Sequence, residues 1–200
     1  GEVIVATEDQ EILEDVKNNG GNAILTKKKH KTGTDRIYEA LNIFGRNEVD
    51  FVMNIQGDEP DIEIEDIQIL DAKMKSNESK IGTMAAKISK KEMYENENVV
   101  KVQTEESFEK NSFPYAKNFM RKTNVKVDVF HHMGIYSYQV ETLRKFISLP
   151  QSKNELKDRL EQFRAMDNGI KINVALAKKS PIGVDTKEDY LAIKNIMKYK

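Results

Sequence analysis

Short apolar runs alternate with amphipathic segments along the first part of the 200-residue chain. Runs of β-branched and apolar residues predict strands at 2–6, 22–26 and 51–55. Apolar residues at helical spacing predict helices at 8–18, 35–44 and 63–76. Strands that alternate with helices in this way indicate right-handed crossovers. The pattern therefore predicts an α/β fold in which helices flank a mostly parallel central sheet.

The same alternation continues through the second half, with one interruption. Strands are predicted at 81–88, 99–103, 127–139 and 171–177. Helices are predicted at 90–97, 140–147, 153–167 and 186–199, the third with Leu156, Leu160 and Phe163 along one face. The polar stretch 104–126 has little periodicity and indicates a hairpin or an excursion. Because no repeat, low-complexity tract or linker interrupts the chain, we predict one domain over 1–200.

The strand at 51–55 ends at a turn with unusual chemistry, Gln56-Gly57-Asp58-Glu59-Pro60. Gly57 permits a sharp exit and Pro60 prevents a return to the sheet. Ligands of open α/β sheets bind beyond the carboxyl ends of the strands, where Asp58 and Glu59 are expected. A helix-capping role for these acids is the alternative.

A second acidic turn, Gly183-Val184-Asp185-Thr186, follows the last predicted strand. If Asp58 and Asp185 converge, the two carboxylates about 4 Å apart would repel by roughly 4 kcal/mol at an effective dielectric near 20. A divalent cation relieves this repulsion, and all-oxygen ligation suits Mg²⁺. The alternative for Asp185 is a helix N-cap completed by Glu188.

Two further groups of residues could bind a ligand. The segment Lys31-Thr32-Gly33-Thr34-Asp35-Arg36 brings hydroxyls and a guanidinium to a helix N-terminus, with Thr34 as the expected N-cap, and can hold an anion, a base or a ribose. Strand alternation places His132, Gly134, Tyr136 and Tyr138 on one face. Glu161 and Gln162 lie beside the apolar stripe of the helix 153–167. The alternative for the segment 31–36 is a solvated basic loop, and the alternative for His132 is a packed core histidine. For Glu161 and Gln162 the alternative is an ordinary exposed helix surface.

Composition narrows the class of protein. A net charge of -1 gives no electrostatic case for nucleic acid or a membrane surface. The chain has no cysteine, so thiolate catalysis and thiolate metal sites are excluded. No apolar run approaches the roughly 18 residues of a membrane span, and no signal peptide is visible at the start. A cytoplasmic protein without nucleic-acid or membrane partners is expected.

The motifs HKTGTDR, NIQGDEP, HMGIY, LEQFR and GVDTKED, in this order, resemble the 3-deoxy-manno-octulosonate (Kdo) cytidylyltransferase family over essentially the whole chain. The resemblance implies a Rossmann-like nucleotidyltransferase fold and a cytoplasmic homodimer in lipopolysaccharide biosynthesis. It implies Mg²⁺-dependent transfer of CMP from CTP to the anomeric hydroxyl of Kdo, with release of pyrophosphate. An excursion at about 104–139 would contribute to the acceptor site and the dimer contact.

Carried over by motif, the resemblance assigns three groups of residues. Asp58 and Asp185 match the catalytic metal-binding acids. The nucleotide-binding positions are His30, Gly33, Thr34, Arg36, Gln56 and Gly57. The sugar-binding positions are Lys117, His132, Tyr136, Glu161 and Gln162. Lys117, with Ala116 before it, stands where the family has a Ser-Arg pair, and lysine lacks the bidentate fork that grips a carboxylate.

The family's N-terminal strand and phosphate loop, PARxxSxRxPxK, have no counterpart here. We therefore expect the 200-residue chain alone to be marginally stable and inactive, and the upstream segment to restore order and activity. Two alternative functions follow: a cytidylyltransferase for another acidic sugar, or a non-catalytic fragment that binds nucleotide or sugar. Product analysis with several sugar acids tests the first alternative. The upstream coding sequence tests the second, because a phosphate loop encoded there would favour the enzyme.

Overall fold

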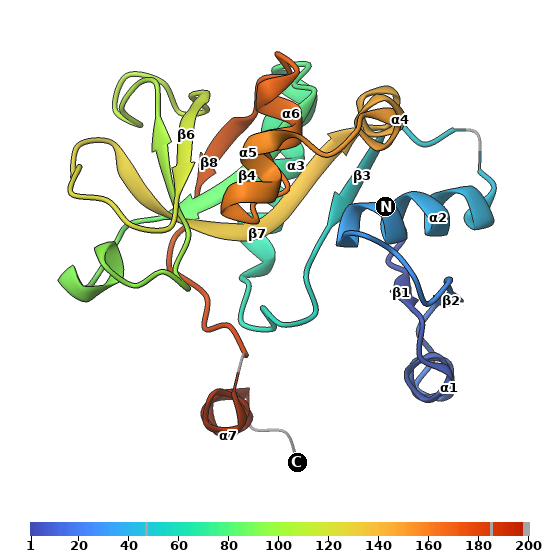
Figure 1. Cartoon of the computed structure of the whole chain (residues 1–200). Coiled ribbons are helices and arrows are strands. Elements are labelled where there is room, and N and C mark those ends of the chain that lie inside the picture. The colour runs from blue at the N-terminus through green and yellow to red at the C-terminus, as the bar shows by residue number, and fades with distance from the viewer. Residues whose placement is uncertain (47, 185, 198–200) are drawn as a thin grey trace. The chain divides into compact units, whose positions relative to one another are not determined.

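The computed structural model describes residues 1–46, 48–184 and 186–197. The chain forms two compact units (Figure 1). The first unit comprises Gly1–Asp50 and Val140–Pro150, and the second comprises Phe51–Gln139 and Gln151–Lys200. The prediction of one domain over 1–200 stays a prediction. Among the described residues, each helix is too short or too polar to cross a bilayer.

The first unit is built on a small parallel pair of strands. Strand β1 (Val5–Thr7) pairs with β2 (Ala23–Leu25), and α1 (Gln10–Asn18) connects them. Asp9 begins α1, because its carboxylate accepts from the backbone N–H groups of Glu11 and Ile12. Helix α2 (Gly33–Phe44) contacts both strands and also α4 (Val140–Ser148), so the returning chain completes this unit.

The second unit contains a six-stranded sheet centred on the long strand β7 (Val129–Gln139). Its neighbours are β3 (Phe51–Asn54), β4 (Ile81–Ala86) and β5 (Lys101–Thr104), and the outer strands are β6 (Ala116–Met120) and β8 (Asn173–Leu176). Strands β3, β4 and β5 run antiparallel to β7, and among the described strands of this sheet only β4 and β8 pair in parallel.

The α/β class is confirmed, but the prediction of a mostly parallel sheet was wrong for this unit. The reason is the stretch 104–139, which forms a hairpin-like return through β6 and then crosses the sheet as β7. Alternating apolar runs do not reveal strand direction, so the pattern alone could not show this reversal.

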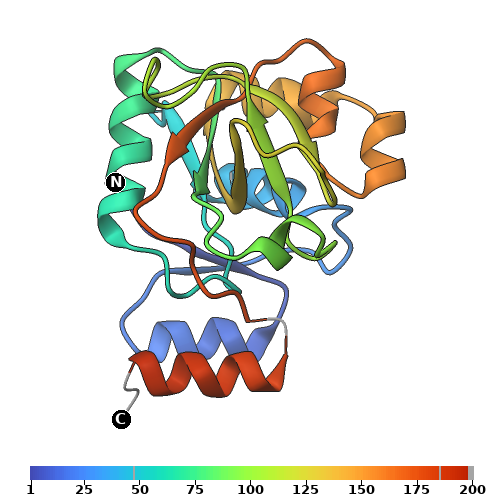
Figure 2. The same ribbon diagram turned by 90° about the vertical axis from the view of Figure 1, so that its left-hand side faces the viewer.

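Helices cover both faces of the six-stranded sheet. Helix α3 (Ile64–Ser76) lies on one face, whereas α5 (Lys153–Asp158) and α6 (Phe163–Asp167) lie on the other, as the two views agree (Figures 1 and 2). Leu70 and Met74 of α3 are fully buried against Met84 and Ile135. The remaining elements are a 3₁₀ helix, η1 (Lys91–Tyr94), and α7 (Lys187–Met197).

Two predicted helices differ in detail. Thr34 does not cap α2: Thr32 does, in a capping box with Asp35, and Thr34 lies buried in the first turn. The helix predicted at 153–167 is two short helices, because Arg159 adopts a left-handed conformation (φ 53°) that ends α5. Leu156 is consequently 61% exposed, whereas Leu160 and Phe163 are buried. Periodicity alone does not detect a break when apolar residues continue on both sides of it.

Candidate active site

The acidic turn after β3 lies beside the second acidic turn of the sequence. The Glu59 N–H donates to the Gln56 carbonyl at 3.3 Å, which closes the turn around Gly57 and Asp58. The Val184 N–H donates to the Asp58 carbonyl at 2.8 Å, so residues 183 and 184 lie against this turn. The side chain of Asp58 is exposed. Asp185 lies outside the described residues, so its convergence with Asp58 stays a prediction.

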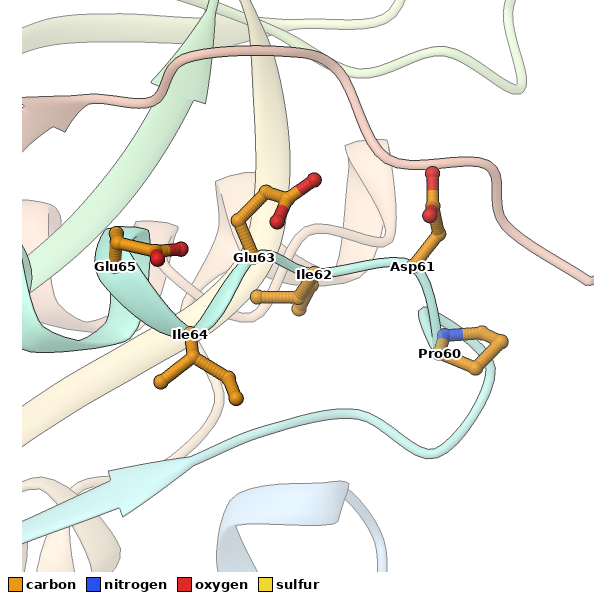
Figure 3. A pocket seen from close by; sticks show the side chains of 6 residues that line it. All are labelled: Pro60, Asp61, Ile62, Glu63, Ile64 and Glu65. Atoms are coloured by element: carbon orange, nitrogen blue, oxygen red, sulfur yellow. The ribbon is translucent and has the colours of Figure 1, made fainter. Parts of the chain in front are cut away.

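The C-terminal segment follows the chain that leads from this turn into α3. The Lys178 N–H donates to the buried Asp66 carboxylate at 3.1 Å, and the Lys179 ammonium lies 3.1 Å from Asp61 and 2.9 Å from Glu63. These two acids raise the pKa of Lys179, Glu63 most strongly. Figure 3 shows both carboxylates around a shallow pocket lined by residues 60–65. The contacts of Lys178 and Lys179 hold the segment that leads to Val184, and they leave the side chain of Asp58 uninvolved.

A second cluster lies on β7 and on the turn between α5 and α6; we call His132, Tyr136, Glu161 and Gln162 the β7 cluster. The ring centroids of His132 and Tyr136 are 5.4 Å apart, and Tyr136 stacks on Tyr138 at 5.9 Å. The predicted common face of His132, Tyr136 and Tyr138 is thereby confirmed. Glu161 lies near enough to Tyr136 for its charge to affect the pKa of that phenol.

His132 is held in one protonation state and one tautomer. Burial, with a smaller contribution from His131, lowers the pKa of His132 to about 3, so the ring is neutral at physiological pH. Its Nε2 lies 3.0 Å from Oγ1 of Thr83, and that hydroxyl lies 2.7 Å from the Ile135 carbonyl. A carbonyl only accepts, so the Thr83 proton goes to Ile135 and Nε2 must carry the imidazole proton. His132 therefore keeps a lone pair on Nδ1.

Two polar groups of the β7 cluster are buried and lack a hydrogen bond of normal geometry to any described residue. They are the Tyr136 hydroxyl and the Gln162 amide nitrogen. Burial, helped by the charges of Tyr138, Glu161 and Glu59 and partly opposed by a contact with the Thr83 hydroxyl, raises the pKa of Tyr136 well above its usual 10, so its hydroxyl stays protonated. A buried polar group left unsatisfied costs about 1–3 kcal/mol, which a bound ligand with acceptor oxygens would recover.

A buried ion pair supports the turn that carries Glu161 and Gln162. The Arg164 guanidinium contacts the Glu155 carboxylate at 2.5 and 2.9 Å, and both side chains are at most 4% exposed. Burial alone would raise the pKa of Glu155, but hydrogen bonds from Arg164, Gln151 and Ser152 outweigh it and lower the pKa. The sequence prediction placed Glu161 and Gln162 on a continuous helix, which was wrong. The break at Arg159 places both in the turn, at 26% exposure for the Glu161 side chain and 8% for Gln162.

The predicted nucleotide loop, residues 30–36, belongs to the first unit. The His30 ring bonds to the Glu39 carboxylate, and the guanidinium of Arg36 bonds to Glu8 and, at 2.6 Å, to the Thr26 hydroxyl. Gly33 is exposed at the first position of α2, whereas Thr34 is 1% exposed. Of the other predicted residues, Gln56 is partly buried and Lys117 is exposed on the outer strand β6.

Comparison with known proteins identifies the family. The cytidylyltransferase family profile matches residues 1–172. The 3-deoxy-manno-octulosonate cytidylyltransferase of Thermodesulfovibrio yellowstonii is 40% identical, with 94% of this chain and 78% of the relative covered. That of Francisella philomiragia is 37% identical over 97% of this chain and 81% of the relative. The chain belongs to the 3-deoxy-manno-octulosonate cytidylyltransferase family.

Solved structures agree with this membership. The CMP:2-keto-3-deoxy-manno-octonic acid synthetase complexed with CTP matches with a TM-score of 0.87 at 32% identity, covering 99% of this chain and 81% of that chain. An apo UDP-glucose pyrophosphorylase matches with a TM-score of 0.63 at 12% identity, over 94% of this chain and 69% of that one, which supports the nucleotidyltransferase fold alone. The resemblance inferred from the five motifs is thus confirmed, and so is the fold class.

The donor set of this cytidylyltransferase suits the cation that its family implies. Among the described residues there is no group of three or more metal-ligating side chains. Asp58, however, presents an exposed carboxylate beside the turn at 183–184, and its backbone is fixed by the bond to Val184. Magnesium is commonly held by one or two carboxylates while water and substrate phosphates fill its other positions. The site therefore fits Mg²⁺ with few protein ligands.

Sequence reasoning missed two contributions to this site. One is Glu59, whose Oε1 accepts from the Gly134 N–H at 3.0 Å. The other is the Glu155–Arg164 pair. The sequence signal for Glu59 is its place directly after Asp58 in the acidic turn, but the sequence gives no sign that its partner is Gly134. No local pattern reveals the second, because a buried charge pair resembles surface charges in sequence.

Proposed function

We propose that this member of the family transfers CMP from CTP to the anomeric hydroxyl of Kdo and releases pyrophosphate. The sugar oxygen forms a bond to the α-phosphorus, the bond from that phosphorus to the bridging oxygen breaks, and the hydroxyl proton is lost. Such a displacement requires positioning and charge neutralisation more than a protein nucleophile. The observation that carries the proposal is the match over 99% of the chain to a synthetase complexed with CTP.

The acceptor is assigned to the β7 cluster. A sugar acid offers a carboxylate and several hydroxyls, and the Tyr136 hydroxyl and Gln162 amide are buried donors suited to acceptor oxygens. His132, neutral and with a free Nδ1 lone pair, would accept from a sugar hydroxyl. Glu161 would accept another, and Lys117 would add a positive charge for the carboxylate. These assignments follow the chemistry of each group together with the family motifs.

The nucleotide is assigned to the residues His30, Gly33, Thr34, Arg36, Gln56 and Gly57. The N-terminus of a twelve-residue helix favours negative charge, and α2 begins at Gly33. Because Arg36 is already bonded to Glu8 and Thr26, its contribution includes holding the loop in shape. Asp58 and Asp185 would hold Mg²⁺, which when bound neutralises phosphate charge and lowers the proton affinity of the attacking hydroxyl. A homodimer in the cytoplasm, supplying lipopolysaccharide biosynthesis, completes the proposal.

The direct test is product analysis. The chain, with the upstream segment restored, is incubated with CTP, MgCl₂ and either Kdo or another eight- or nine-carbon sugar acid, and CMP-sugar and pyrophosphate are quantified. We expect CMP-Kdo with stoichiometric pyrophosphate. CMP transfer to another acid in preference to Kdo would redirect the proposal to that acceptor, for which the exposed Lys117 would be the first residue to examine.

Asp58→Asn removes one negative charge and keeps the side chain's size. Several kcal/mol of charge stabilisation would be lost, so turnover should fall by about a thousandfold or more. Because Asp58 is exposed and its structural bond uses the backbone carbonyl, the melting temperature should stay within about 2 °C. The check is steady-state kinetics beside a thermal melt, and full activity in this variant would remove Asp58 from the reaction.

A further inference from the structure

Strand β7 has a gap along one of its edges. On that edge β3 pairs with Tyr136–Gln139 and β5 pairs with Val129–His131. The His132 N–H extends the β5 side by donating to the Val100 carbonyl at 2.9 Å. Successive N–H groups of a strand alternate between its edges, so Gly134 is the next donor that faces the gap. No described strand lies opposite it.

The carboxylate of Glu59 fills this position. Its Oε1 accepts from the Gly134 N–H at 3.0 Å, where a neighbouring strand would otherwise supply a carbonyl. The bond satisfies a backbone donor that the ladder leaves without a carbonyl at this position. Glu59 thus replaces one rung of the ladder between β3 and β5, from the turn that also holds Asp58.

The acidic turn packs closely against β7 at this point, so a side chain here would have to displace Glu59 or Gln56. A Cβ added to Gly134 would lie 3.2 Å from Glu59 Oε1 and 3.3 Å from Gln56 Cγ, tighter than ordinary van der Waals contact. The φ of Gly134 is not positive, so conformational freedom does not explain this glycine. The close approach of the acidic turn does.

The contact joins two parts of the site that the proposed function assigns to different substrates. Asp58 precedes Glu59 directly, and its carbonyl accepts from Val184 at 2.8 Å. On the other side, Tyr136 follows Gly134 on the same face of β7, with its ring beside His132. The Glu59–Gly134 bond therefore links the Asp58 turn to β7 beside the β7 cluster, beyond the point where the pairing of β3 with Tyr136 ends.

We propose that Glu59 is a positioning residue whose bond to Gly134 adjusts the distance between the cation site at Asp58, where the CTP phosphate would lie, and the sugar held by the β7 cluster. The inference rests on the proposed function. A displacement of about 1 Å between reacting groups can cost about a hundredfold in rate. Glu59 itself touches neither substrate in this account.

The first experiment compares Glu59→Asp with Glu59→Gln. Aspartate is one methylene shorter and cannot reach Gly134, so kcat should fall about 10- to 100-fold while the KM for CTP changes less than about twofold. Glutamine keeps the reach and an acceptor oxygen, so kcat should recover to within about fivefold of wild type. Glu65→Asp, at an exposed position in the first turn of α3, is the matched control and should keep wild-type kinetics.

Two kinetic results would overturn the proposal: wild-type kcat in Glu59→Asp, or a Glu59→Gln variant as impaired as Glu59→Asp. Gly134→Ala provides a second approach, because the added methyl pushes against Glu59 from the other side. Its kcat should fall in the same way without a change in the KM for CTP.

A measurement without substrates tests the contact itself. Amide hydrogen exchange at Gly134, followed by ¹⁵N NMR, should accelerate at least about tenfold in Glu59→Asp and stay near wild type in Glu59→Gln. Unchanged exchange in Glu59→Asp would refute the bond. A wild-type protein that protects Gly134 but makes no CMP-Kdo would refute the proposed function, and the positioning role with it, while leaving the contact intact.

Discussion

The loop at the start of α2 and the β7 cluster are both rich in polar side chains, but they satisfy them differently. In the α2 loop, Thr32 and Asp35 bond to each other in a capping box, His30 bonds to Glu39, and Arg36 bonds to Glu8 and Thr26. In the β7 cluster, the Tyr136 hydroxyl and the Gln162 amide nitrogen are buried and make no hydrogen bond of normal geometry to any described residue.

The two regions therefore differ in what a ligand can add to their hydrogen bonding. A loop whose charged groups are already paired is shaped by its own contacts, and it presents mainly backbone at a helix N-terminus to a ligand. A cluster whose buried donors lack a hydrogen bond of normal geometry carries a folding cost that a ligand with acceptor oxygens would offset. We infer that mutations in the α2 loop lower stability and binding together, whereas removing an unsatisfied donor of the β7 cluster weakens binding without lowering stability.

The largest effect should come from Gln162→Ala. This variant removes a buried donor assigned to the sugar, and it leaves the Glu155–Arg164 pair that holds the turn intact. The KM for Kdo should rise about 10- to 100-fold, corresponding to about 1.4–3 kcal/mol of lost hydrogen bonding. The KM for CTP should change little in the same steady-state titrations. Equal rises for both substrates would argue against a dedicated sugar site.

The next effect concerns the neutral histidine of the β7 cluster. Because the pKa of His132 is lowered from 6.5 to about 3, the unfolded chain binds a proton that the folded chain does not between these pH values. The stability that this group contributes is fully present above pH 6.5 and is lost as the pH falls toward 3. The slope is at most about 1.4 kcal/mol per pH unit.

The check is urea unfolding at several pH values between 4 and 7. His132→Gln should flatten the dependence, and His131→Gln, whose pKa is also lowered by burial, should flatten it less because that ring is more exposed. An unchanged slope in His132→Gln would mean that the imidazole titrates normally in the fold.

The smallest of the three effects belongs to the α2 loop. Arg36→Ala loses a partly exposed ion pair to Glu8 and a hydrogen bond to Thr26, together about 1–2 kcal/mol of stability. Because the loop loses its shape, the affinity for CTP should fall about tenfold in a fluorescence or calorimetric titration. Arg36→Lys should recover little of it, since lysine lacks the planar fork that bonds two partners.

Glu8→Ala separates the two contributions, because it removes the ion pair from a residue that was not assigned to the nucleotide. It should lose stability and a smaller part of the CTP affinity. Unchanged CTP affinity in Arg36→Ala would assign the loop a structural role only.

Most of the fold and the family were accessible from the sequence. The order of strands and helices was predicted with boundaries a few residues off, since periodicity and turn residues act locally. Strand direction was not, because the reversal through 116–139 depends on which strands pair. The break at Arg159 was also missed, because a left-handed residue other than glycine gives no signal in the pattern.

The parts of the site that depend on short-range rules were predicted, whereas the parts that depend on long-range contacts were not. Tyr136 and His132 share a face because strand alternation is a short-range rule, and motif resemblance supplied Glu161 and Gln162. The tie between Glu59 and Gly134 joins residues far apart in the chain, as does the pair of Val184 with Asp58. Such contacts follow from the packing of the whole unit, so local sequence patterns do not predict them.

Tyr136→Phe deletes only the buried hydroxyl, which makes no hydrogen bond of normal geometry in the fold and is assigned to the sugar. We expect the melting temperature to rise about 2–4 °C, because an unsatisfied group worth about 1 kcal/mol is removed, and the KM for Kdo to rise about tenfold. The measurement is a thermal melt without ligand beside a Kdo titration at saturating CTP. A lower melting temperature with an unchanged KM for Kdo would contradict the account, because the hydroxyl would then serve the fold and not the sugar.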